Sequence, residues 1–95
     1  MSVQQAGTDI RVLRELEEFL LVEALFVSCM QPSDDPTPPR VHRAITETIV
    51  RFGTDACAAL VAVEFGDHPD TAVDRMTWAR QAVRASYPTA ARQAL

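Results

Sequence analysis

The stretch from Phe19 to Met30 constrains the fold of this chain more than any other segment. It reads FLLVEALFVSCM, and eleven of its twelve residues are uncharged, with Glu23 as the exception. A helix that crosses a bilayer needs about 20 apolar residues, so this stretch is too short to span a membrane. It must therefore be buried by the rest of the chain or by a second copy of it.

The first helix is predicted over residues 9–30, which contain no Gly or Pro, and Thr8 or Asp9 offers an N-terminal cap. Its first half is amphipathic, but from Leu21 onward apolar residues occupy two sides of the helix. One face of a small bundle cannot bury both sides without a further neighbour, so we predict an isologous homodimer. The predicted interface consists of Leu21, Val22, Leu25 and Cys29.

Two further helices are predicted, over residues 38–65 and 68–87, after a connection that holds four prolines in residues 31–39. Gly53 is the weak point of the middle helix. The apolar stripe continues in register across it, from Phe52 to Ala56, Ala59, Leu60 and Val63, which favours one continuous or kinked helix. In the alternative interpretation, Gly53 ends one helix and Thr54 or Asp55 caps the next. The prediction is an all-α three-helix bundle, or four helices if the middle one is split.

Length and charge limit the class of protein. With 95 residues, of which 47% are hydrophobic, the chain fits a single domain over residues 9–87, between a flexible N-terminus (1–8) and a C-terminal tail (88–95). A net charge of −4 argues against nucleic-acid binding, which depends on cationic surface. The first residues lack the pattern of a signal peptide. We therefore expect a cytoplasmic protein that makes no membrane contact.

Metal and redox chemistry find little support in the sequence. Cys29 and Cys57 both lie among apolar residues and are predicted to be small buried side chains rather than a disulfide. Neither His42 nor His68 has a second ligand at helical spacing on a core face. We predict no metal and no cofactor.

Glu23 is the main candidate for a functional side chain. It falls on the core-facing side of the first helix, where a lone carboxylate would be costly unless it were paired, protonated or facing a cavity. It could instead lie at the solvent edge, or carry an interface charge. Arg80, on the apolar side of the last helix, is its natural partner, unless the guanidinium reaches water. With these two residues, the predicted ligand cavity is lined by Phe19, Phe26, Met30 and Met76.

Trp78 is predicted to point away from the core side of the last helix, either as a contact surface or laid over the bundle. Because no catalytic constellation is present, and Glu23 is only a weak catalytic candidate, our first hypothesis is a non-catalytic interaction module. Such an accessory or regulatory protein would bind another protein. The alternative is a small-molecule-binding bundle, conceivably an enzyme, with Glu23 and Arg80 in an apolar cavity.

Overall fold

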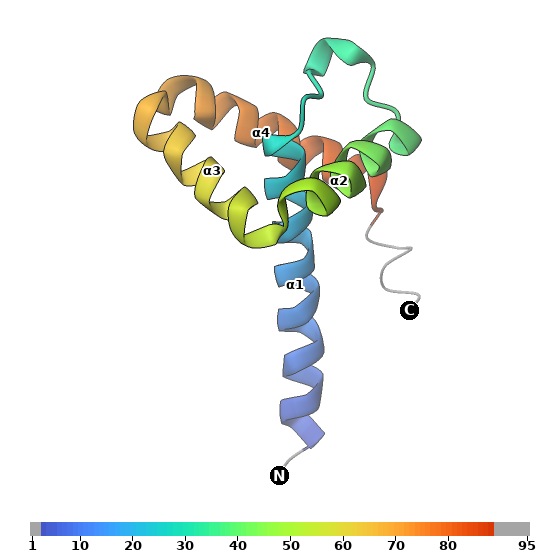
Figure 1. Ribbon diagram of the computed structural model, residues 1–95. Coiled ribbons are helices and arrows are strands. Elements are labelled where there is room, and N and C mark those ends of the chain that lie inside the picture. The colour runs from blue at the N-terminus through green and yellow to red at the C-terminus, as the bar shows by residue number, and fades with distance from the viewer. Residues whose placement is uncertain (1–2, 89–95) are drawn as a thin grey trace.

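The computed structural model describes residues 3–88, and the side chains from residue 12 onward. These residues form α-helices and one short 3-10 helix, η1, without any strand (Figure 1). The prediction of an all-α fold is confirmed, and the number of α-helices in this part of the chain is four rather than three. Their bounds are α1 Val3–Val27, η1 Pro32–Asp34, α2 Pro38–Phe52, α3 Thr54–Asp67 and α4 Pro69–Ser86.

Gly53 separates α2 from α3. Its backbone has φ 82° and ψ 162°, a conformation that is essentially restricted to glycine. The N–H of Gly53 still donates to the carbonyl oxygen of Ile49 at 2.8 Å, and the Gly53 carbonyl accepts the N–H of Cys57 at 3.2 Å. Gly53 is thus both the C-cap of α2 and the N-cap of α3. The prediction of a continuous middle helix is wrong, and the split at Gly53 is confirmed, although Gly53 itself and not Thr54 or Asp55 is the N-cap of α3.

The turn at Gly53 also changes which side of the helix faces the core. The apolar stripe was predicted to pass in register from α2 into α3, yet α3 buries Cys57 and Val61 while Leu60 and Val63 remain exposed. Because the chain changes direction at Gly53, helical register before the turn does not determine the buried face after it.

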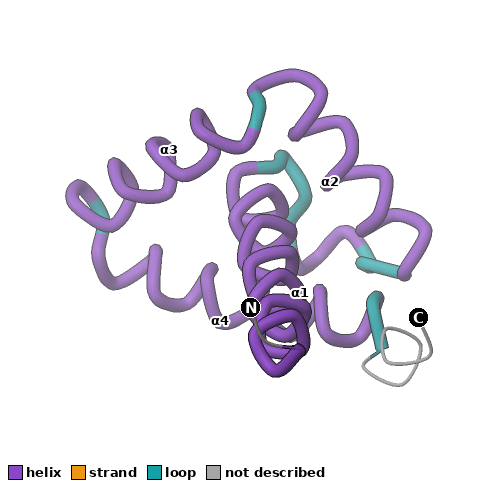
Figure 2. Tube along the Cα trace, turned by 90° about the horizontal axis from the view of Figure 1, so that it is seen from below, coloured by secondary structure: helices purple, strands orange, loops and turns teal. Residues whose placement is uncertain are grey.

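The inner half of α1, residues 21–27, is the centre of the molecule. Viewed along α1, the helices α2, α3 and α4 surround it (Figure 2). All residues from 22 to 26 are buried there. The core consists of Val22, Ala24, Leu25, Phe26, Val41, Ile45, Cys57, Val61, Ala72, Met76, Ala79 and Val83.

The outer half of α1, residues 3–20, extends away from the other helices (Figure 1). At about 1.5 Å per residue this half is roughly 27 Å long, and it accounts for a shape of 44 × 28 × 25 Å. The helix begins at Val3, earlier than the predicted start at residue 9. Residues 1–2, and 89–95 of the predicted tail, lie outside the described residues.

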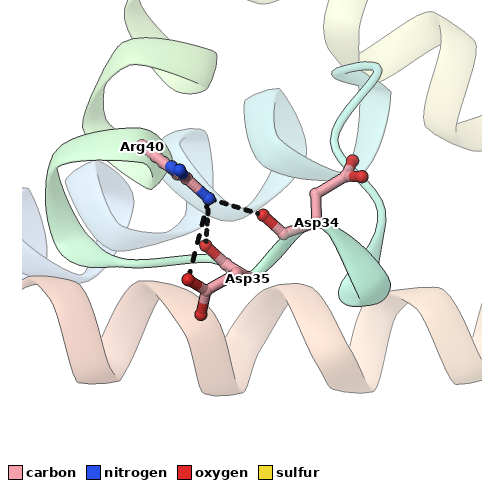
Figure 3. Close-up of polar contacts among 3 residues, drawn as sticks. All are labelled: Asp34, Asp35 and Arg40. Atoms are coloured by element: carbon pink, nitrogen blue, oxygen red, sulfur yellow. Dashed lines mark hydrogen bonds and ion pairs between the residues drawn. The ribbon is translucent and has the colours of Figure 1, made fainter.

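Arg40 fastens the proline-rich connection to the first turn of α2 (Figure 3). Its Nη1 donates to the carbonyl oxygens of Asp34 at 3.1 Å and Asp35 at 3.4 Å, and lies 3.7 Å from Oδ2 of Asp35. The N–H of Gln31 donates to Oδ2 of Asp34 at 2.8 Å. These contacts stabilise the connection that leads from the end of α1 to the start of α2.

Candidate functional site

An apolar stripe on the outer half of α1 is the main candidate site. Its five members lie on one side of the helix and are between 38% and 63% exposed. We call them the outer stripe: Val12, Leu13, Leu16, Phe19 and Leu20. An exposed apolar side chain is ordinary by itself, whereas a contiguous row on one helix face is typical of a contact surface.

The outer stripe is exposed because the bundle covers only the other half of α1. Both halves of the helix carry an apolar face, but α2, α3 and α4 meet α1 only toward its C-terminal end (Figures 1 and 2). Leu25 is fully buried there, while Leu13, three turns earlier, is 63% exposed. A single helix therefore supplies both the centre of the core and an uncovered apolar face.

Acidic residues border the outer stripe. At about 100° per residue, Glu15 and Glu17 lie on opposite sides of Leu16, and both are exposed. We call this pair the acidic edges. Glu18 lies behind the stripe and forms an ion pair with Arg84 of α4, with Oε2 and Nε 3.6 Å apart. The stripe thus has negative charge on both of its long sides.

Glu23 lies where the outer stripe enters the bundle. The residue is only 6% exposed, and burial raises the pKa of its carboxyl group. It lies near Cys57 of α3, whose thiol pKa is raised by burial and, in second place, by the Glu23 charge. No ion pair joins Glu23 to another described residue. Glu23 is therefore a buried carboxyl group that ionises less readily than the same group in water.

Arg75 is the residue that sequence reasoning missed. From α4 it donates through Nε to the carbonyl oxygen of Phe26 at 2.8 Å, and through Nη2 to those of Ser28 at 2.9 Å and Met30 at 2.8 Å. Its guanidinium also lies over the rings of Phe26 and Trp78. The last four carbonyls of a helix lack partners within that helix. Of the three carbonyls that Arg75 binds, that of Phe26 belongs to this set, while those of Ser28 and Met30 lie in the chain just after the helix.

One signal in the sequence could have indicated this cap. The last turn of α1 contains no basic residue, and no glycine follows it to form a left-handed cap. Ser28 donates to the carbonyl oxygens of Ala24 and Leu25, so a donor from another element is needed for the carbonyls that follow these two. The sequence alone leaves open which arginine supplies it.

A pocket of about 360 Å³ opens between the C-terminal end of α1, α3 and α4. Its lining mixes apolar side chains with polar ones at the rim. The lining residues are Phe26, Val27, Ser28, Gln31, Leu60, Val63, Glu64, Thr71, Ala72 and Arg75. Arg75 already donates hydrogen bonds to three carbonyl oxygens, and these bonds explain why its side chain lies at this pocket.

The predicted ligand residues are not gathered around this pocket. Phe26 is the one member of the predicted set that lines it. Arg80 is exposed on α4, so its guanidinium reaches water instead of pairing with Glu23. Phe19 is 52% exposed on the outer stripe, Met76 is buried in the core, and Met30 is half-buried.

The predicted interface residues also have different surroundings. Val22 and Leu25 are buried within the same chain, and Leu21 is half-buried. The split at Gly53 gives α1 a third neighbouring helix, which covers the second apolar side without another copy. Cys29 is exposed, and Trp78 is half-buried, with the Arg75 guanidinium 4.9 Å from its ring centroid.

His42 is used in packing. Its ring stacks on Tyr87 at 4.4 Å between centroids, and its Nε2 lies 2.9 Å from the carbonyl oxygen of Ser86. Among the described side chains, those of residues 12–88, no three from His, Cys, Asp or Glu are placed to hold a metal ion. No helix within residues 3–88 combines the length and apolar character needed to cross a membrane.

Comparisons of the chain with protein-family models, curated proteins and solved structures find no match. The outer stripe, its acidic edges and the buried Glu23 are therefore interpreted from their own geometry.

Proposed function

We propose that this protein is a helical interaction module that binds a helical segment of another protein through the outer stripe. The observation that carries the proposal is the exposure of five apolar side chains on one face of a projecting helix. This proposal keeps the interaction function expected from the sequence but places the contact on the outer stripe of α1 instead of at Trp78 of α4.

The energetics of a projecting helix support the proposal. Most helical stability in proteins comes from packing of an apolar face rather than from the intrinsic helix propensity of the residues. Complete burial of a Leu or Phe side chain contributes about 1.5–3 kcal/mol. A partner that covers Leu13, Leu16 and Phe19 would thus gain affinity and also stabilise the outer half of α1.

The spacing of the outer stripe fits recognition by another helix. Leu13, Leu16 and Leu20 recur at intervals of three and four residues, the repeat by which side chains of two helices interdigitate. Helices that pack in this way lie about 8–10 Å apart. The stripe from residue 12 to residue 20 offers about 13 Å of such contact, or somewhat more than two turns.

Site-specific crosslinking tests this function. A photocrosslinking amino acid at Leu13 in the full chain, expressed in its source cells, is expected to give discrete protein adducts. The matched control is the same amino acid at Val50, an apolar residue of α2 that is 81% exposed. Leu16→Ser should remove the Leu13 adducts because it interrupts the stripe.

Adducts of equal yield at Leu13 and Val50, or adducts that persist with Leu16→Ser, would contradict the proposed function. A circular dichroism spectrum matching wild type must accompany Leu16→Ser. Since Leu16 is 51% exposed, we expect this variant to fold.

The other sequence hypotheses have less support. The homodimer stays a prediction, but Val22 and Leu25 of its proposed interface are enclosed by their own chain. The small-molecule alternative has a pocket available, yet the Glu23 and Arg80 side chains on which it was based do not line that pocket.

A further inference from the structure

We infer that the partner of the outer stripe is an amphipathic helix that carries basic residues along both edges of its apolar face. This inference rests on the proposed function and specifies the partner by its chemistry.

The negative charge of the acidic edges is the first observation that indicates a basic partner. Glu15 and Glu17 are exposed on opposite sides of Leu16, where they would flank any helix that packs on the stripe. Within residues 12–20 the basic residue is Arg14, which lies about 160° from Leu16 at 100° per residue. Positive charge on the α1 segment therefore faces away from the partner, and negative charge borders it.

A second copy of the chain is a poor match for this surface. In an in-register parallel pair, Glu15 of one copy would lie beside Glu17 of the other; in an antiparallel pair centred on Leu16, each glutamate would lie beside its own counterpart. Like charges brought together at an interface oppose association. Both arrangements therefore juxtapose carboxylates.

The bundle adds a steric obstacle to a parallel pair. Two packed helices run about 8–10 Å apart, but α2, α3 and α4 surround the inner half of α1 (Figure 2). A second α1 that ran parallel along the outer stripe would bring its own surrounding helices into the first bundle. A separate partner helix of two to three turns avoids this collision.

A lipid surface is also a poor match. Helices that lie in the membrane interface generally carry Lys and Arg on the polar face, where they meet anionic headgroups. The outer stripe is bordered by Glu15 and Glu17 instead. Lysine or arginine on a partner helix would neutralise these carboxylates while apolar side chains cover the stripe.

Two designed peptides test the inference on the full chain. Both are labelled helical peptides with the same leucine stripe at i, i+3, i+4 and i+7; one has lysines along the stripe edges and the other has glutamates. Fluorescence anisotropy measures the affinity of each peptide at low and at high salt. The lysine-edged peptide is expected to bind at least about ten-fold more tightly, a difference of about 1.4 kcal/mol, and this preference should weaken at high salt.

Variants of the chain separate the contribution of charge from that of the stripe. The double variant Glu15→Lys/Glu17→Lys should reverse the preference in favour of the glutamate-edged peptide. Leu16→Ser should weaken the binding of both peptides, and Val50→Ser should change neither.

The outcomes distinguish the inference from the proposed function. If the two peptides bind with equal affinity and Leu16→Ser weakens the binding of both, the inference of a basic partner is overturned. The proposed docking function is then retained. Leu16-dependent dimerisation in sedimentation velocity, or binding to vesicles of anionic phospholipid, would overturn the inference in favour of a second copy or a membrane. If neither peptide binds and the chain remains a monomer, the inference is overturned, and failure to crosslink at Leu13 then removes the proposed function too.

Discussion

The Nε atom of Arg75 lies 2.8 Å from the carbonyl oxygen of Phe26, so a side chain of α4 completes the C-terminal end of α1 across 49 residues of sequence. Together with the bonds to Ser28 and Met30, this contact fixes the end of the central helix.

Replacement of Arg75 by alanine is expected to lower the free energy of unfolding by about 2–4 kcal/mol, because it leaves three carbonyl groups with fewer partners and removes the stem from the core edge. Arg75→Lys should recover part of this loss, since an ammonium group keeps the charge but cannot reproduce the planar fork. Urea unfolding measures the effect. Arg80→Ala on the exposed side of α4 is the control and should lie within about 0.5 kcal/mol of wild type; similar losses at both positions would contradict the capping role.

Glu23→Gln should raise the stability of the protein at pH 7 relative to wild type. Burial raises the pKa of Glu23 in the folded state, so its contribution to stability is fully present below the unfolded-state pKa and is lost as pH rises through the folded-state pKa. The stability of wild type should therefore fall relative to Glu23→Gln as pH rises from 4.5, the ordinary pKa of the group, through its raised folded-state pKa. Urea unfolding at several pH values measures this difference, and a constant difference would show that Glu23 titrates alike in both states.

Gly53→Ala is expected to destabilise the fold by about 1–3 kcal/mol, because a Cβ atom is strained at this backbone conformation. An added Cβ would meet no atom within 4 Å, so the cost arises in the backbone itself. Gly66→Ala is the matched control within α3, where the backbone is helical and a Cβ again has open space. It should stabilise by about 0.5–1 kcal/mol. Thermal unfolding that shifts in the same direction for both variants would contradict this account.

We expect Leu25→Ala and Leu13→Ala to show that the two halves of α1 contribute differently to the stability of the fold. Leu25 is fully buried and its truncation is expected to cost about 2–5 kcal/mol, whereas truncation of the exposed Leu13 should change stability by less than about 0.5 kcal/mol. Urea unfolding of the isolated chain measures both variants. A large loss for Leu13→Ala would mean that the outer stripe is already covered in solution.

The helical fold and most element boundaries could be predicted from local chemistry. The sequence shows a proline at the start of α2, another at the start of α4, and a proline-rich connection after α1. Helices begin where prolines fit the first turn. The burial of Val41 and Ile45 follows from helical spacing. These features depend on neighbours within a few residues.

The division of α1 into an enclosed and an exposed half could not be predicted, because it depends on tertiary packing. Leu13 and Leu25 are the same residue type on the same helix, and only the positions of α2, α3 and α4 distinguish them. The cap by Arg75 likewise joins residues that are distant in sequence. The buried face of α3 differs from the one that a continuous stripe predicts, because the backbone conformation of Gly53 turns the chain between α2 and α3.

The cap by Arg75 has a consequence for the order of events during synthesis. Translation proceeds at about 5–20 residues per second, so the 49 residues between Phe26 and Arg75 correspond to roughly 2–10 s during which the end of α1 lacks the hydrogen bonds from Arg75. Through this interval the apolar inner half of α1 also lacks α4. The nascent chain therefore holds this apolar segment well before the residue that secures its end.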